Sequence, residues 1–246
     1  MKNTEYQNIL RRKNLGQKML SILLDPDKTN LEDVQELSKK LYATPVTHIL
    51  VGGSQQDTKH PQALVKALKK HINLPVFLFP GHPQQITPEA DALLFLSLLN
   101  ATDAKYLIGM QTEAAPLAKA SELEVISTGY ILVDGGSITT VQQVTNTSPL
   151  PQHQSEKAAN LALAAEYLGI KLIYLEAGSG AKTPISSDFI KKVREKTSLP
   201  ILVGGGIKNL QQIKSAYDAG ADMIVIGTAF ENNPLFLESL KSLFHE

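Results

Sequence analysis

Eight short apolar runs recur along the chain of 246 residues, and this recurrence limits the possible folds more than any other feature. Each run is almost continuously apolar instead of alternating, which is typical of strands buried on both faces of a parallel sheet. The runs lie at residues 19–25, 47–53, 75–81, 90–97, 124–134, 171–178, 200–206 and 221–228. We therefore expect eight parallel strands.

Amphipathic helical patterns lie between many of these runs. Segment 209–220, for example, has apolar spacing with Asn209 in an N-cap position and Gly220 at its end. Similar patterns cover 30–42, 59–71, 155–169 and 187–196. The alternation predicts an α/β fold, a single-domain (β/α)8 TIM barrel over residues 1–246 with an extra N-terminal helix. A doubly wound open sheet is the alternative.

Two connections do not fit a regular barrel. The segment after the third run carries Pro83 and Pro88, so a regular helix is doubtful there. The segment 135–154, after the fifth run, is long and polar and contains two prolines. We interpret it as an extended loop that could cover a ligand.

Composition excludes several classes of protein. Lys plus Arg and Asp plus Glu both number 24, so no basic excess points to a nucleic-acid partner. The absence of Cys excludes disulfides, zinc–thiolate sites and thiol catalysis. No apolar stretch approaches the roughly 20 residues that span a bilayer, and no signal peptide precedes the first run. We expect a soluble, cytoplasmic protein that does not span the membrane.

Glycines gather where three of the predicted strands end. In such barrels the site lies at the carboxyl ends of the strands, and phosphate often binds after strands 7 and 8. The small residues at these ends are Gly178, Ser179 and Gly180, then Gly204, Gly205 and Gly206, then Gly227 and Thr228. Such loops could form turns only. Their convergence favours a phosphate site, because a phosphate needs several N–H and O–H donors.

Glu176 and Tyr174 lie on the same face of the sixth run. A carboxylate at the end of a buried strand costs free energy unless it is paired or used. Glu176 is therefore a candidate base beside the phosphate site, or a structural carboxylate capped by a neighbouring N–H. Tyr174 could bind a ligand through its hydroxyl or pack in the barrel core.

Asp25 and Ser54 follow the first and second runs. A carboxylate and a hydroxyl form a thin ligand set, which suits Mg²⁺ that takes its other ligands from water and a diphosphate. Asp25 before Pro26 could equally cap a turn. Asp134 is another carboxylate at a strand end, with a turn role at least as plausible. The six histidines show no metal-ligand spacing.

Five segments carry a resemblance to a known family. "LLDPDK", "VGGS", "YLEAGSGA", "VGGGI" and "VIGTAFE", in this order, resemble geranylgeranylglyceryl phosphate synthases across essentially the whole chain. The resemblance implies an enzyme, a Mg²⁺-dependent prenyltransferase that joins sn-glycerol 1-phosphate to an all-trans prenyl diphosphate. The products would be an ether, used in phospholipid biosynthesis, and diphosphate.

The resemblance also assigns roles to residues. Asp25 and Ser54 would bind Mg²⁺ on the prenyl diphosphate, and Glu176 would accept the proton of the attacking hydroxyl. The glycerol phosphate would be held by Tyr174, Leu175, Glu176, Ala177, Gly178, Ser179, Gly180, Gly205, Gly206, Gly227 and Thr228. Phe79, Phe95 and Leu98 are candidates to line a prenyl groove, or ordinary core residues.

One departure concerns the first run. Some bacterial relatives place a lysine two residues before the strand-1 aspartate, where this chain has Leu23. The sequence resembles the second, longer subgroup, for which geranylgeranyl diphosphate is the favoured donor. Family members form homo-oligomers, dimers or hexamers, and peripheral contact with a membrane would suit a lipid product. Two rival functions remain: a sugar-phosphate isomerase or aldolase-type barrel, and a non-catalytic barrel that binds a phosphate ligand.

Overall fold

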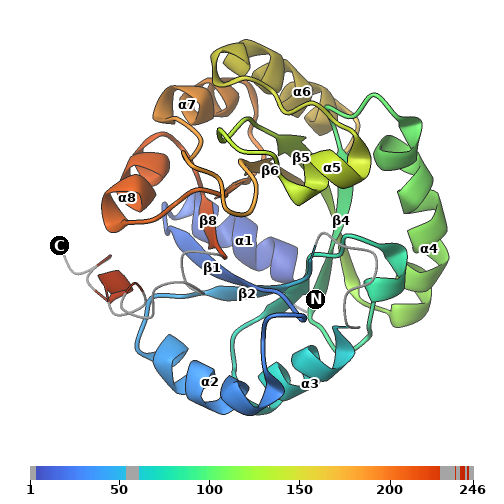
Figure 1. Ribbon diagram of the computed structural model, residues 1–246, viewed down its shortest axis with the longest axis vertical. Helices are drawn as coiled ribbons and strands as arrows, with labels where there is room; N and C mark the ends of the chain where they lie inside the picture. The colour runs from blue at the N-terminus through green and yellow to red at the C-terminus, as the bar shows by residue number, and fades with distance from the viewer. Residues whose placement is uncertain (1–3, 54–60, 228–235, 237–238, 242, 244–246) are drawn as a thin grey trace.

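A closed barrel of eight parallel strands forms the centre of the protein (Figure 1). The computed structural model describes residues 4–53, 61–227, 236, 239–241 and 243. The strands are β1 (Met19–Leu24), β2 (His48–Val51), β3 (Val76–Leu78), β4 (Ala92–Leu98), β5 (Glu124–Leu132), β6 (Leu172–Glu176), β7 (Ile201–Gly204) and β8 (Met223–Ile226). Because β1 pairs with both β2 and β8, the barrel is closed and the open-sheet alternative is wrong.

Alternation along each strand divides the core into two layers. In β6, Leu172 and Tyr174 pack inside the barrel, whereas Ile173 and Leu175 pack between the strands and the helices. Both sets are fully buried, which explains why every run is continuously apolar. Glu176 continues the inward-facing set at the carboxyl end of β6.

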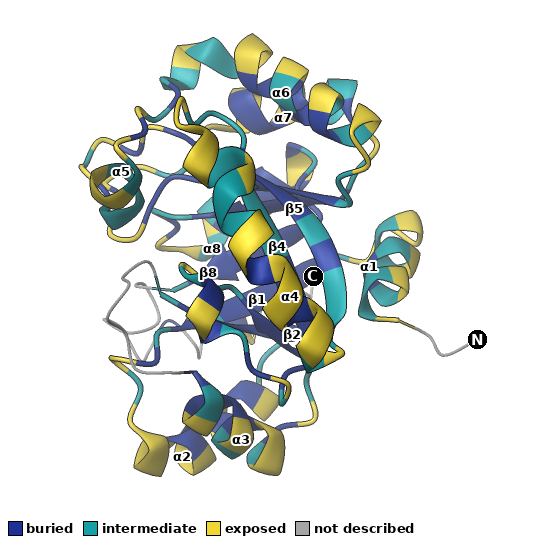
Figure 2. Cartoon of the chain, turned by 90° about the vertical axis from the view of Figure 1, so that its right-hand side faces the viewer, coloured by how far each residue is buried: buried dark blue, intermediate teal, exposed yellow. Residues whose placement is uncertain are grey.

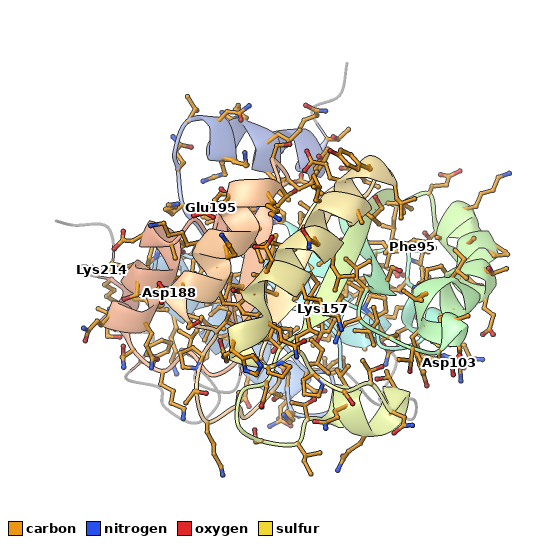
Figure 3. The ribbon with its side chains drawn as sticks, turned by 90° about the horizontal axis from the view of Figure 1, so that it is seen from above. Phe95, Asp103, Lys157, Asp188, Glu195 and Lys214 are labelled. Atoms are coloured by element: carbon orange, nitrogen blue, oxygen red, sulfur yellow. The ribbon has the colours of Figure 1, made fainter. Side chains whose placement is uncertain are left out.

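Helices surround the barrel and carry the charged surface. They are α2 (Val34–Tyr42), α3 (Gln62–His71), α4 (Met110–Ser121), α6 (Ser155–Tyr167), α7 (Ser187–Lys196) and α8 (Leu210–Asp218). Figure 3 labels Lys157 on α6 and Asp188 and Glu195 on α7, all exposed on the outer face of this ring. The patterns noted above did not include α4, whose apolar periodicity is weak and whose interior contains Pro116.

An extra helix, α1 (Glu5–Asn14), covers the amino-terminal end of the barrel, as predicted. Ile9 is fully buried in the inner apolar cluster with Met19. The carboxylate of Glu124, the first residue of β5, accepts the N–H groups of Glu5 (2.6 Å) and Tyr6 (3.2 Å). These bonds satisfy donors that a helix start leaves unpaired. The helix α5 (Thr140–Thr145) lies at the opposite end of the barrel (Figure 2).

The two connections predicted to be irregular have different structures. Among the described residues between β3 and β4, the chain forms no α-helix, only a 3-10 turn at Pro83–Gln85, as the prolines indicated. The segment 135–154 is not simply extended, because it contains α5 and a 3-10 turn at Gln152–Gln154. The hydroxyl of Thr139 starts α5 by accepting the N–H of Gln142 at 3.1 Å.

Within the described part of the chain, no helix has the length and apolar character needed to cross a membrane.

Candidate functional site

A cavity of about 440 Å³ opens at the carboxyl ends of the strands, and we call it the central cavity. The loops after β5, β6, β7 and β8 supply most of its wall. Of the residues predicted to hold the glycerol phosphate, those that line it are Tyr174, Glu176, Gly178, Ser179, Gly180, Gly205, Gly206 and Gly227. The barrel therefore brings the glycine-rich strand ends and the acidic residue of β6 to one place.

Glu176 is the acid of this cavity. Its side chain is only 8% exposed, and its Oε1 accepts the N–H of Gly178 at 2.6 Å. Burial raises the pKa of Glu176 from 4.5 to about 7, while the nearby Tyr174 hydroxyl and the Gly178 N–H oppose the rise. A carboxyl with this pKa exchanges protons readily near neutral pH, as a general base must.

Tyr174 lies two residues before Glu176 on the same inward face of β6. Its hydroxyl is buried and has no hydrogen-bond partner within the described residues. Burial, followed by the negative charge of Glu176, raises the pKa of Tyr174 well above its usual value. The hydroxyl therefore stays protonated and can donate a hydrogen bond to a ligand. Its ring meanwhile packs in the barrel core. Tyr174 can therefore both pack in the core and offer its hydroxyl to a ligand.

The glycine loops supply backbone donors. Four of the glycines on the cavity have positive φ: Gly178 (+96°), Gly180 (+73°), Gly205 (+83°) and Gly206 (+70°). At Gly205 an added Cβ would lie 2.5 Å from Oε1 of Glu176 and 2.6 Å from the N of Gly178, so only glycine fits. The N–H groups of Gly205 and Gly206 make no hydrogen bond to another described residue. They can bind the oxygens of an anion.

Leu175 and Ala177 do not line the central cavity. Both side chains are fully buried in the outer apolar layer, away from Tyr174 and Glu176. Any contact of theirs with a ligand would come from the backbone. Thr228 lies outside the described residues.

Asp25 lies on the turn after β1, two residues beyond Leu23, which lines the central cavity. Asp25 itself lines neither this cavity nor the groove described below. Its Oδ1 accepts the N–H of Asp27 at 3.0 Å, and its Oδ2 lies 3.7 Å from Nζ of Lys28. The turn role inferred for Asp25 is therefore present.

The carboxylate of Asp25 has the chemistry of a ligand for a hard cation. Its side chain is 24% exposed, so its oxygens can reach a cation that keeps several water ligands. Ser54, the second predicted ligand, lies outside the described residues. No cluster of three His, Asp or Glu side chains suited to a metal occurs in the described part. One hard carboxylate suits Mg²⁺ held mainly by water and a diphosphate, and would not suffice alone.

A second hollow, which we call the apolar groove, lies between β3, β4, α4 and α5 and measures about 140 Å³. Phe79, Phe95 and Leu98 line it, together with Pro83 of the 3-10 turn. The groove and the central cavity share three lining residues, Phe79, Tyr130 and Val141. The two hollows therefore lie side by side, with these three residues between them.

Several lining residues were not singled out from the sequence. In the sequence Tyr130 is only one residue of an apolar run, whereas in the structure its side chain lies on the inward face of β5. Thr139 and Val141 belong to the segment interpreted as a loop, where the Thr139 N-cap was an available signal. Lys208 also lines the central cavity, two residues after the glycine run, and its Nζ donates to the carbonyl of Lys182 at 3.2 Å.

Comparisons with known proteins agree with this geometry. The model of the PcrB family matches residues 11–244. The geranylgeranylglyceryl phosphate synthase of Flavobacterium johnsoniae is 51% identical over 236 residues, covering 96% of this chain and 97% of that protein. The protein of the same name from Methanosphaera stadtmanae is 40% identical over 237 residues, covering 96% of this chain and 97% of that protein.

A solved structure agrees along almost the whole chain. It is the crystal structure of (S)-3-O-geranylgeranylglyceryl phosphate synthase from Thermoplasma acidophilum in complex with its substrate sn-glycerol-1-phosphate. The TM-score is 0.90 at 33% sequence identity, covering 98% of this chain and 97% of that chain.

Proposed function

The chain belongs to the PcrB family, and from that premise we propose that it is a prenyltransferase acting on sn-glycerol 1-phosphate and geranylgeranyl diphosphate. The reaction forms an ether between the glycerol hydroxyl and C1 of the prenyl chain and releases diphosphate. One observation carries the proposal. Glu176, with a pKa of about 7, faces a glycine-lined cavity that adjoins an apolar groove.

The central cavity suits the phosphate acceptor. Gly205 and Gly206 offer N–H groups that make no hydrogen bond to another described residue, and Ser179 and Gly180 line the wall beside them. Such donors bind phosphate oxygens without placing a fixed positive charge at the reacting centre. Lys208 at the rim adds a cation for the phosphate.

Glu176 acts as the base. The C1–O bond of the allylic diphosphate breaks with its electron pair leaving on the diphosphate. The glycerol oxygen then bonds to C1, and its proton passes to the carboxylate of Glu176. A base with a pKa of about 7 is ionised to a useful extent at neutral pH and still accepts a proton readily. The protonated Tyr174 hydroxyl can hold the glycerol oxygen beside this carboxylate.

The apolar groove suits the prenyl chain. Phe95, which lies beside α4 in Figure 3, and Leu98 give it hydrocarbon walls, and Phe79 lies where it joins the central cavity. The absence of a regular helix between β3 and β4, noted for the described residues, leaves this side of the barrel free for a chain. Burial of each CH₂ in such a groove contributes about 0.8 kcal/mol.

Magnesium completes the donor site in this proposal. Asp25, with Ser54, would hold Mg²⁺ against the diphosphate, where the ion would neutralise negative charge on the leaving group. The support is the accessible Asp25 carboxylate at the mouth of the barrel. We further propose a cytoplasmic homo-oligomer, a dimer or a hexamer, which light scattering on the purified protein would test.

The rival functions find less support in the cavity. A Schiff-base aldolase needs a desolvated lysine, whereas Lys208, the lysine found on the described cavity wall, is exposed. No histidine lines the central cavity among the described residues. A binding barrel without catalysis would not require an ionisable carboxyl at position 176.

The test is product formation from radiolabelled sn-glycerol 1-phosphate, geranylgeranyl diphosphate and Mg²⁺. We expect an apolar labelled phosphate, abolished by chelation and restored by Mg²⁺, and lost in Glu176→Gln and Asp25→Asn. Asp134→Asn is the matched control, because Asp134 accepts the N–H of Gly136 (2.8 Å) as Asp25 accepts that of Asp27, but lines neither hollow. No product with any prenyl length, despite binding of glycerol phosphate, would refute the proposal.

A further inference from the structure

Three aromatic rings form a cluster inside the mouth of the barrel. Ring centroids of Phe79 and Tyr174 lie 5.2 Å apart, those of Tyr130 and Tyr174 5.5 Å, and those of Phe79 and Tyr130 6.2 Å. The chain holds only 7 Phe and 7 Tyr and no Trp, so three rings in one place are a notable concentration. The tilted and edge-on packing of this cluster is favourable in itself.

The cluster lies where the two hollows meet. Phe79 and Tyr130 line both the apolar groove and the central cavity, and Tyr174 lines the central cavity beside Glu176. In the proposed reaction the prenyl chain occupies the groove and the glycerol phosphate the cavity, so the bond between them forms at this junction. The carbon that loses diphosphate is therefore brought next to Phe79 and Tyr130.

That carbon becomes positive during the reaction. The C1–O bond of an allylic diphosphate breaks with its electron pair on the leaving oxygen, and the charge left behind spreads over C1 and C3. The glycerol oxygen then forms the new bond to C1 and gives its proton to Glu176. An aromatic ring attracts such a cation through its quadrupole, most strongly where water is excluded.

We propose that Phe79 and Tyr130, supported from behind by Tyr174, stabilise the allylic cation by cation–π interaction. This inference rests on the proposed function and adds to it. The rings favour the transition state over the ground state, because the neutral prenyl diphosphate carries no such positive charge at C1.

The backbone holds Phe79 firmly in this position. The N–H of Phe79 donates to the carbonyl of Val51 at 2.8 Å, which extends the pairing of β2 with β3. Gly52 allows the close approach, because an added Cβ there would lie 1.8 Å from the carbonyl oxygen of Phe79. A ring fixed in this way needs no rearrangement when charge develops.

The experiment replaces Phe79 by phenylalanines carrying one, two and three ring fluorines, introduced during translation. Each fluorine weakens the negative face of the ring while changing its size little. We expect the single-turnover rate to fall stepwise, by about tenfold at the trifluoro ring, with KM for geranylgeranyl diphosphate within about twofold of wild type. Phe77 is the matched control, since it faces the barrel interior two residues earlier and lines neither hollow.

A second measurement does not depend on turnover. An ammonium analogue of the prenyl cation, with inorganic diphosphate and Mg²⁺, should bind more weakly along the Phe79 series and unchanged along the Phe77 series, by calorimetry. An active wild type with a flat Phe79 series in both measurements would overturn the inference alone. A wild type without turnover on any prenyl diphosphate would overturn the proposed function and this inference together.

Discussion

Replacing Glu176 by glutamine should abolish catalysis and at the same time stabilise the fold at alkaline pH. The pKa of Glu176 is raised by burial from 4.5 to about 7 in the folded chain, so the folded state holds a proton more tightly than the unfolded state does. Below pH 4.5 this carboxyl is neutral in both states and costs nothing. Between pH 4.5 and 7 the unfolded state releases the proton first, and stability falls as pH rises.

The size of the effect follows from the pKa difference. A rise of about 2.5 in pKa corresponds to about 3 kcal/mol, fully present above pH 7 and absent below pH 4.5. Glutamine has nearly the same shape, its Oε1 can still accept the N–H of Gly178, and it never ionises. Glu176→Gln should therefore match wild type near pH 4.5 and exceed it by about 3 kcal/mol at pH 8.5.

The assay is thermal unfolding of both proteins at the two pH values, without substrate. For a chain of this size about 3 kcal/mol corresponds to a gain in Tm of roughly 6–12 °C at pH 8.5. Glu36→Gln is the control, because Glu36 is an exposed carboxylate paired with Lys39 and should leave the pH dependence of wild type unchanged. If the Glu176→Gln protein is no more stable than wild type at pH 8.5, the claim that ionisation of the buried Glu176 carboxyl destabilises the fold is refuted.

Three further predictions concern the base of the barrel and the phosphate site. Burial, with the charge of Arg12, lowers the pKa of His48 to about 3. The contribution of His48 to stability is therefore full above pH 6.5 and should fall by about 3 kcal/mol by pH 4.5. Denaturant titrations of wild type and His48→Gln would measure this loss, and equal acid sensitivity of the two proteins would contradict it. Lys208→Ala should raise KM for glycerol phosphate about tenfold with kcat little changed, and Lys208→Arg should restore it; an unchanged KM would remove Lys208 from the phosphate site. Gly205→Ala should eliminate glycerol phosphate binding in calorimetry, because its Cβ would displace the carboxylate of Glu176; retained affinity would show that this loop does not hold the phosphate.

The strands could be predicted because a parallel strand covered on both faces accepts few residues other than apolar ones. Each of the eight runs overlaps a strand, although every run extends past its strand at one or both ends; the third run, 75–81, exceeds β3 (Val76–Leu78) by four residues. The helix α5 could not be predicted from periodicity, since Thr140–Thr145 is too short to show a 3.6-residue repeat. Only the Thr139 N-cap marked its start, and such caps also occur in plain turns.

The residues of the candidate site could be predicted where the residue type is unusual for its position in the sequence. Glu176 stood out because a carboxylate inside an apolar run costs free energy unless it is paired or used. Gly205 stood out because it lies in a glycine run at a strand end, and the structure adds that its neighbours leave no room for a side chain. Tyr130 carried no such signal, because an aromatic residue in an apolar run is ordinary core. Phe79 was a candidate to line a prenyl groove, with ordinary core as the alternative, and nothing in the sequence placed the two rings together. Their importance depends on β3 and β5 ending beside the same junction, which is a property of the closed barrel and not of either segment.

The burial of Glu176 connects the stability of this protein with its proposed chemistry. The same apolar surroundings that cost about 3 kcal/mol above pH 7 give this carboxyl the pKa that a base requires. They also exclude water from Phe79 and Tyr130, where water would capture a prenyl cation and would weaken its attraction to the rings. A variant that hydrates the junction while leaving Glu176 in place, such as Val141→Ser, should therefore lower the pKa of Glu176, shift the pH–rate profile towards acid and release free prenyl alcohol. Prenyl alcohol formation without a shift of the profile would separate the two effects of burial and contradict their common origin.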